Sequence, residues 1–130
     1  KLAQNLYISA PMVAQHAAIA ALAPSVRPQL DARRDEFRRR RDYLYAALGT
    51  LGFRIASAPP GAFYLYADCS AFTDDSYAFT RELLDEAGVA ITPGRDFGVF
   101  EPRRHVRFAF TTSIERMRQG VDRIEAFVRR

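Results

Sequence analysis

One predicted strand near the end of the chain sets the strongest constraint on the fold. In residues 105–110, HVRFAF, an apolar side chain occupies every second position from Val106 onward, and Arg107 lies on the alternating side. This period of two predicts a β-strand with one buried face. An arginine keeps its charge in a protein, and burying that charge without a partner is costly. The second face must therefore be wet, ion-paired or built to bind an anion.

Length and composition indicate one compact domain. The chain has 130 residues, of which 48% are hydrophobic and 26% are charged. Its net charge of +4 permits a polyanionic partner without requiring one. In the arginine-rich stretch 33–44, RRDEFRRRRDYL, four consecutive arginines surround the predicted helix, and acidic residues lie between the basic ones. This arrangement favours a solvated, ion-paired helix, so no nucleic-acid partner is predicted.

The order of the predicted elements defines the fold class. Two helices are expected first, at residues 11–22 and 29–51, and then a hairpin of strands at 53–57 and 62–68. A third helix follows, capped by Asp74 or Asp75 and ending at Gly88. Strands at 89–92 and 105–110 precede a last helix, which is capped by Thr112. Such an order predicts an α+β fold, with a short, mostly antiparallel sheet covered by helices and preceded by a long connecting helix. Phe97 and Phe100, in the loop before the last strand, are expected to pack inward.

Several kinds of site find no support in the residues. Cys69 is the only cysteine, which suits a reducing compartment and predicts a cytoplasmic protein, and it is interpreted as a structural or surface thiol. His16 and His105 each lack further ligands at metal-binding spacing, so no metal site is predicted. No stretch approaches the ~20 apolar residues of a membrane span, so no membrane partner is predicted either.

Arg107 is the strongest candidate for a binding residue. The planar guanidinium of an arginine can bind a carboxylate through two parallel hydrogen bonds, a geometry that lysine does not reproduce. The alternative is an edge-strand arginine that points at water. Periodicity alone does not separate these two interpretations.

Three segments together resemble a known family. They are APPGAFYLYADCS (58–70), GVAITPGRDFG (88–98) and HVRFAFTTSIERMRQGVDRI (105–124), and they are similar to the C-terminal part of class I/II aminotransferases, the fold-type I enzymes that depend on pyridoxal phosphate. The stretch RRDYLYAALGTLGF (40–53) resembles the long helix that joins the two domains of that family. QNLYISAPMVAQHAAIAAL (4–22) resembles a stretch shortly after the family's cofactor lysine, so the likeness covers nearly the whole chain.

The resemblance implies a function and a set of site residues. The expected reaction is transfer of an amino group between an amino acid and a 2-oxo acid, with pyridoxal 5'-phosphate as cofactor and a homodimer as the assembly. Arg107 would bind the substrate α-carboxylate, and Phe63 and Gly61 would lie near the substrate entrance. Ser9 and Tyr7 would approach the cofactor site of the neighbouring subunit.

The resemblance also implies that the site is incomplete in this chain. The only lysine, Lys1, does not have the sequence setting of the cofactor lysine, so we expect no catalytic residue here and a piece that is inactive alone. Residues 1–28 are expected to end the large cofactor domain, and residues 29–130 to form the small C-terminal domain.

Two other classes of function stay open at this point. Lyases, decarboxylases and synthases on the same scaffold share this C-terminal pattern. A non-catalytic protein, either an aminotransferase-like transcription regulator or a basic nucleic-acid-binding module, is the other alternative.

Overall fold

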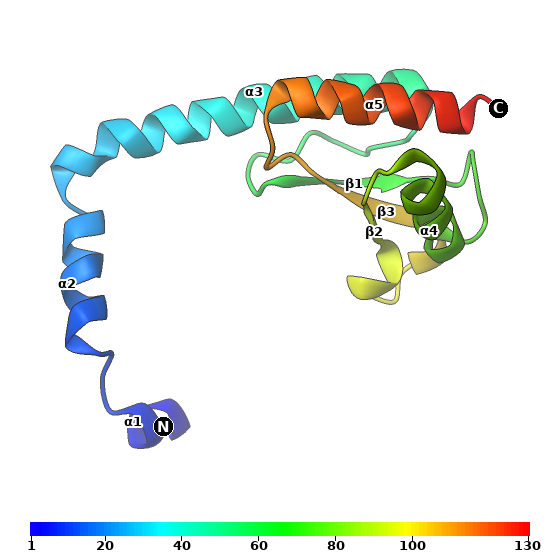
Figure 1. Cartoon of the computed structure of the whole chain (residues 1–130). Coiled ribbons are helices and arrows are strands. Elements are labelled where there is room, and N and C mark those ends of the chain that lie inside the picture. The colour runs from blue at the N-terminus through cyan, green and yellow to red at the C-terminus, as the bar shows by residue number, and fades with distance from the viewer. The chain divides into compact units, whose positions relative to one another are not determined.

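The computed structural model describes residues 1–130 and contains five α-helices and three strands (Figure 1). They are α1 (Leu2–Tyr7), α2 (Met12–Ala21), α3 (Arg27–Leu51), β1 (Tyr64–Asp68), α4 (Ser76–Ala87), β2 (Thr92–Pro93), β3 (His105–Ala109) and α5 (Ile114–Val128). Short 3₁₀ turns occupy Pro24–Val26, Gly94–Asp96 and Pro102–Arg104. The contacts divide the chain into two units, residues 1–36 and 37–130, and each is described by itself.

The second unit contains a three-stranded antiparallel sheet in the order β1-β3-β2. This sheet confirms the predicted α+β fold with a short antiparallel sheet. The predicted hairpin is wrong, because residues 53–57 contribute only an isolated bridge from Arg54 to Asp68, and the ladder partner of β1 is β3. Pro59 and Pro60 follow that bridge, and a proline has no N–H to donate to a ladder.

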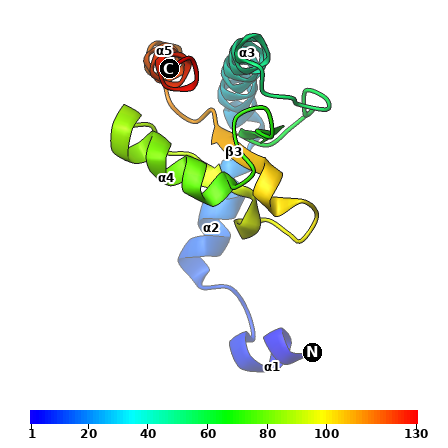
Figure 2. The ribbon, with the colours of Figure 1, turned by 90° about the vertical axis from the view of Figure 1, so that its right-hand side faces the viewer.

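Helices α4 and α5 and the C-terminal half of α3 share one core with the sheet. Figure 2 shows α5 beside α3 at the top of the view, with α4 below them. The core cluster consists of Leu44, Leu48, Phe53, Leu65, Ala67, Cys69, Phe79, Leu83, Val106, Phe108, Phe110, Met117, Val121 and Ile124. On β3, Val106 and Phe108 enter this core, as the alternation predicts. The intervening Arg107 therefore faces away from it.

The helix ends follow from local hydrogen bonds. The Asp75 carboxylate caps α4 by accepting from the backbone N–H groups of Tyr77 and Ala78, and Gly88 ends the helix in a left-handed conformation with φ 65°. For α5, the predicted cap Thr112 is wrong. The cap is Ser113, whose extended backbone directly precedes the first helical residue and whose hydroxyl accepts from the N–H of Arg116 at 3.4 Å.

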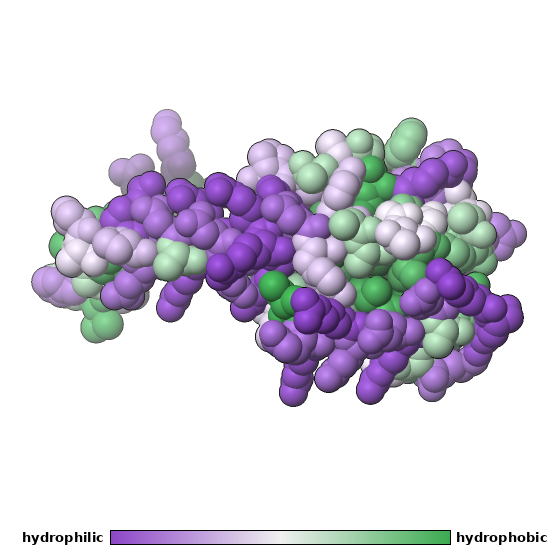
Figure 3. Space-filling view, turned by 90° about the horizontal axis from the view of Figure 1, so that it is seen from above, coloured by the Kyte–Doolittle hydropathy of each residue, from purple (hydrophilic) through white to green (hydrophobic).

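The first unit has little buried surface of its own. Neither α1 nor α2 contains a buried residue, and their exposed apolar side chains are Leu2, Leu6, Tyr7, Met12, Val13 and Ile19. Figure 3 shows hydrophilic side chains along α3. The ion pairs of this helix include Arg27–Asp31 and Arg34–Asp31. None of the helices combines the length and the apolar character that crossing a membrane requires.

Two adjacent leucines of α4 test the core. Leu83 is fully buried, whereas half of Leu84 is exposed. We expect Leu83→Ala to lower the free energy of unfolding by about 2–5 kcal/mol, because it removes buried methyl groups and leaves a cavity. The matched variant Leu84→Ala is expected to cost less than about 1 kcal/mol. Urea unfolding of both variants measures the difference, and equal losses would contradict this position of the core.

Candidate substrate-binding site

Arg107 lies in the middle of the sheet, on the face opposite the core. The ladders place it across from Tyr66 of β1 and Thr92 of β2. Its Nη2 donates a hydrogen bond to the Thr92 hydroxyl at 3.3 Å. The central strand thus fixes where the side chain begins, and the edge strand supplies one polar contact to its head.

Two aromatic rings pack around the guanidinium of Arg107. The guanidinium carbon lies 4.5 Å from the centre of the Phe97 ring and 5.4 Å from that of Tyr64. Contacts of this kind between a cation and a ring contribute roughly 0.5–2 kcal/mol, more when water is excluded. The head group is therefore held by rings while its charge is not neutralised.

The hydrogen-bonding capacity of Arg107 is largely unused within the chain. No carboxylate among residues 1–130 forms an ion pair with it, and its Nε is buried without an acceptor. A buried unpaired polar atom costs about 1–3 kcal/mol, and a guanidinium has five N–H donors. The alternative of a purely solvated arginine is disfavoured, because the side chain is half-buried and ring-packed. The site is suited to an external anion with planar acceptors.

The loop before β3 is drawn close to the sheet at Gly94. A Cβ atom at this position would lie 2.5 Å from the carbonyl oxygen of Pro102, 2.8 Å from that of His105 and 2.8 Å from the Tyr66 hydroxyl. Only glycine fits between these groups, so the loop that carries Phe97 can approach the Arg107 face.

The two loop phenylalanines do not pack into the core, so the prediction of inward packing is wrong. Phe97 is 45% exposed and Phe100 is 80% exposed. Phe97 instead lies over Arg107 and meets the Tyr66 ring edge-on at 6.2 Å. A ring that packs on a cation can remain half in water, and this is why apolar character alone gave the wrong expectation.

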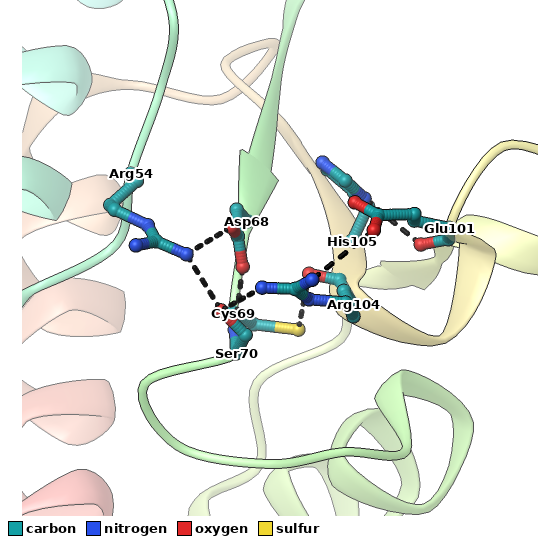
Figure 4. A network of polar contacts seen from close by, with 7 residues as sticks. All are labelled: Arg54, Asp68, Cys69, Ser70, Glu101, Arg104 and His105. Carbon is teal, nitrogen blue, oxygen red and sulfur yellow. Dashed lines mark hydrogen bonds and ion pairs between the residues drawn. The ribbon is translucent and has the colours of Figure 1, made fainter.

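A polar network ties the end of β1 to the start of β3 (Figure 4). Asp68 accepts hydrogen bonds from the Ser70 N–H at 2.7 Å and from Arg54 Nη2 at 2.5 Å. Burial alone would raise the pKa of the Asp68 carboxyl, but the hydrogen bonds from Ser70 and the ion pair with Arg54 outweigh it and lower the pKa to about 2. Asp68 is thus a charged structural anchor at one edge of the Arg107 face.

Cys69 and His105 also have structural surroundings. Cys69 is fully buried, its thiol donates to the Arg104 carbonyl at 3.3 Å, and burial raises the thiol pKa to about 11. This agrees with the interpretation of a structural thiol. The His105 ring stacks parallel to the Tyr66 ring at 5.0 Å, and its Nδ1 lies 3.0 Å from the Glu101 carbonyl oxygen. The chain contains no group of three metal-binding side chains.

The two residues predicted to lie near the substrate entrance, Phe63 and Gly61, come just before β1. Phe63 is 48% exposed, and its ring meets the Tyr64 ring edge-on at 5.6 Å, which links it indirectly to Arg107. Gly61 is exposed in the preceding turn, and no contact joins it to Arg107. Ala62 between them has φ 63°, a conformation that residues with a Cβ rarely adopt.

Tyr7 and Ser9 belong to the first unit and flank a strained residue. Ile8 has φ 58° and ψ −67°, and the Ser9 N–H donates to the Tyr7 carbonyl at 2.5 Å, which makes a tight γ-turn. Both polar side chains are exposed. Their hydroxyl groups could donate to an anionic phosphate, but neither can bind a cofactor aldehyde. Lys1 has the only side-chain amine in the chain, the group that could form a Schiff base with such an aldehyde.

Sequence reasoning missed Thr92, Phe97 and Tyr64 as neighbours of Arg107. The alternation of 62–68 put Tyr64 on the exposed side of its strand, which is a usable signal. Thr92 and Phe97 depend on the pairing of β2 with β3 and on the path of the loop, neither of which leaves a local pattern.

Comparison with known proteins then identifies the family. The model of the family "Aminotransferase class I and II" matches residues 1–124. The chain belongs to the class I and II aminotransferase family. An aspartate/prephenate aminotransferase of Thermus thermophilus is 40% identical over 113 residues, which are 85% of this chain and 28% of that protein. A (5-formylfuran-3-yl)methyl phosphate transaminase of Methanocaldococcus jannaschii is 33% identical over 98% of this chain and 33% of its own length.

Solved aminotransferase structures share the fold. The crystal structure of an aminotransferase from Mycobacterium tuberculosis superimposes with a TM-score of 0.91 at 35% identity, covering 98% of this chain and 33% of that one. The chain thus spans about a quarter to a third of the length of the curated aminotransferases it matches. Enzymes of this family depend on pyridoxal phosphate.

Gly94 offers a test of the close loop approach. We expect Gly94→Ala to lower the free energy of unfolding by about 1–3 kcal/mol, because two of the groups that a Cβ would meet are backbone carbonyls that cannot move aside. Gly120→Ala in α5 is the matched control. A Cβ there meets open space, and replacing a helical glycine should stabilise by up to about 1 kcal/mol. Thermal unfolding of both variants measures these changes in stability. A Gly94→Ala variant as stable as the parent would contradict the predicted clash.

Asp68 makes stability depend on pH. The folded pKa of Asp68, about 2, lies below the ordinary 3.8, so its contribution to stability is complete above about pH 5 and is lost as the pH falls through 3.8 toward 2. We expect Asp68→Asn to cost about 1–2 kcal/mol at pH 6, a figure reduced because the Arg54 partner is exposed. Urea unfolding from pH 2 to 6 should show the gap between variant and parent closing at low pH. A difference in unfolding free energy that stays constant from pH 2 to 6 would show that ionisation of Asp68 is not its cause.

Proposed function

We propose that this chain is the C-terminal part of a longer pyridoxal-phosphate-dependent aminotransferase, which transfers an amino group between an amino acid and a 2-oxo acid. The observation that carries the proposal is Arg107, a strand arginine within the residues that the family model covers, whose donors find no carboxylate in its own chain. Its proposed role is to bind the substrate α-carboxylate through paired hydrogen bonds. By fixing that group, it orients the bonds at the substrate Cα for reaction.

The remaining roles follow from the same proposal. Phe63 and Gly61 border the substrate entrance, whereas Tyr7 and Ser9 contribute polar groups at the cofactor phosphate of a neighbouring subunit in a homodimer. When bound, the cofactor supplies the electron sink for bond breaking at the substrate Cα. The lysine that binds it lies outside this chain, so residues 1–130 alone are inactive. Residues 1–28 end the large domain, residues 29–130 form the small domain, and the enzyme is cytoplasmic.

The activity is tested on the full-length protein supplied with pyridoxal phosphate. A panel of amino acids is offered with 2-oxoglutarate or pyruvate, and formation of the new 2-oxo acid is measured. We expect transamination of at least one amino acid. Release of carbon dioxide or ammonia instead of transamination would show a different reaction on the same scaffold.

The role of Arg107 is tested by substitution in that full-length protein. We expect Arg107→Ala to lower kcat/KM for the amino acid about 100-fold or more, mainly through KM, because charge-assisted hydrogen bonds contribute about 1.5–3 kcal/mol each. Arg107→Lys should have a kcat/KM almost as low as that of Arg107→Ala, because an ammonium lacks the planar pair of donors. Arg103→Ala removes an exposed arginine that pairs with Asp75 and serves as the matched control, expected within about twofold of the parent. An unchanged kcat/KM in Arg107→Ala would refute this assignment.

A further inference from the structure

We infer that Thr92 and Phe97 are positioning residues that hold the Arg107 guanidinium in the plane in which it binds a substrate carboxylate. The inference rests on the proposed function, because it assigns roles to the neighbours of Arg107 in that same site. Neither residue touches the reacting atoms. They act through Arg107.

Thr92 fixes one corner of the guanidinium without neutralising it. The β2–β3 ladder sets Thr92 directly opposite Arg107, and its hydroxyl accepts from Nη2 at 3.3 Å. A hydroxyl is an uncharged acceptor, so the positive charge stays available to an incoming anion. An aspartate at this position would form an ion pair with Arg107 and compete with the substrate. A threonine can orient the head group while leaving its charge unpaired.

Phe97 fixes the plane of the guanidinium from a ring that is itself held in place. The Phe97 N–H donates to the Gly94 carbonyl at 2.9 Å, and its ring meets Tyr66 edge-on at 6.2 Å. Gly94 is buried and packed against backbone oxygens, so the start of this loop is anchored to the sheet. The Phe97 ring centre then lies 4.5 Å from the guanidinium carbon of Arg107.

The chemistry of carboxylate binding explains why orientation matters. Two parallel hydrogen bonds form only when the guanidinium and the carboxylate are nearly coplanar. A free arginine side chain samples many rotamers, and ordering it on binding reduces affinity. A hydroxyl at one nitrogen and a ring over the central carbon restrict that sampling before the substrate arrives.

The test measures carboxylate recognition apart from catalysis. The probes are propanoate and its neutral analogue propanamide, titrated into the full-length protein and followed by ligand-observed NMR. We expect Phe97→Ala and Thr92→Val to weaken propanoate binding about 3- to 20-fold, because each removes one cation–ring contact or one hydrogen bond. Binding of propanamide should be unchanged. The conservative variants Phe97→Tyr and Thr92→Ser should stay within about twofold of the parent. Steady-state kinetics should show the same order in KM for the amino acid.

The outcomes separate this inference from the proposed function. If Arg107→Ala loses the preference for propanoate while Phe97→Ala and Thr92→Val keep it, the positioning role is wrong and the carboxylate clamp stands. If Arg107→Ala keeps the preference, or the parent has none, the clamp itself is wrong and the positioning role falls with it. Equal weakening of both probes in Phe97→Ala or Thr92→Val would indicate general damage and would also overturn the positioning role.

Discussion

The structure depends on the burial of one face of β3. Val106 and Phe108 enter the core shared by α3, α4 and α5, and Phe110 follows them in the same cluster. Burying such side chains stabilises by about 1.5–3 kcal/mol each, so the register of this central strand is strongly fixed. A shift by one residue would place Arg107 in the core, at a cost that the apolar gains could not offset. The same force that builds the core therefore holds a guanidinium on the opposite face.

The opposite face gathers polar and aromatic groups from segments distant in sequence. Tyr64 and Tyr66 come from β1, Thr92 from β2 and Phe97 from the loop that Gly94 anchors. Tyr64, Thr92 and Phe97 contact the head of Arg107 and leave its charge without a carboxylate partner. Next to Asp68, the Cys69 N–H donates to the Arg104 carbonyl at 2.8 Å and Arg104 Nη2 donates to the Ser70 hydroxyl at 3.4 Å, which fastens the neighbouring ends of β1 and β3. An arginine on a rigid sheet is preorganised in a way that a loop arginine is not.

Features of the fold and of the site could be predicted from sequence where they depend on neighbouring residues, and not where they depend on distant segments. The alternation around Arg107 and the cap at Asp75 are local, and both predictions are confirmed. The predicted hairpin was wrong because β1 pairs with β3, a strand distant in sequence, and such a pairing leaves no local pattern. Phe97 was assigned to the core by its apolar character, whereas its partner is a cation brought close by tertiary structure. The roles of Phe63, Gly61, Tyr7 and Ser9 came from family resemblance alone and stay predictions.

We propose that Arg107 keeps its charge free for a substrate carboxylate. A crystal structure of the full-length protein with bound 2-oxo acid tests it most directly. We expect both carboxylate oxygens within about 3 Å of the Arg107 guanidinium nitrogens, a range typical of charge-assisted hydrogen bonds, with the Phe97 ring still packed against the guanidinium. A carboxylate bound elsewhere, or an Arg107 paired with an acidic side chain of the protein itself, would contradict it.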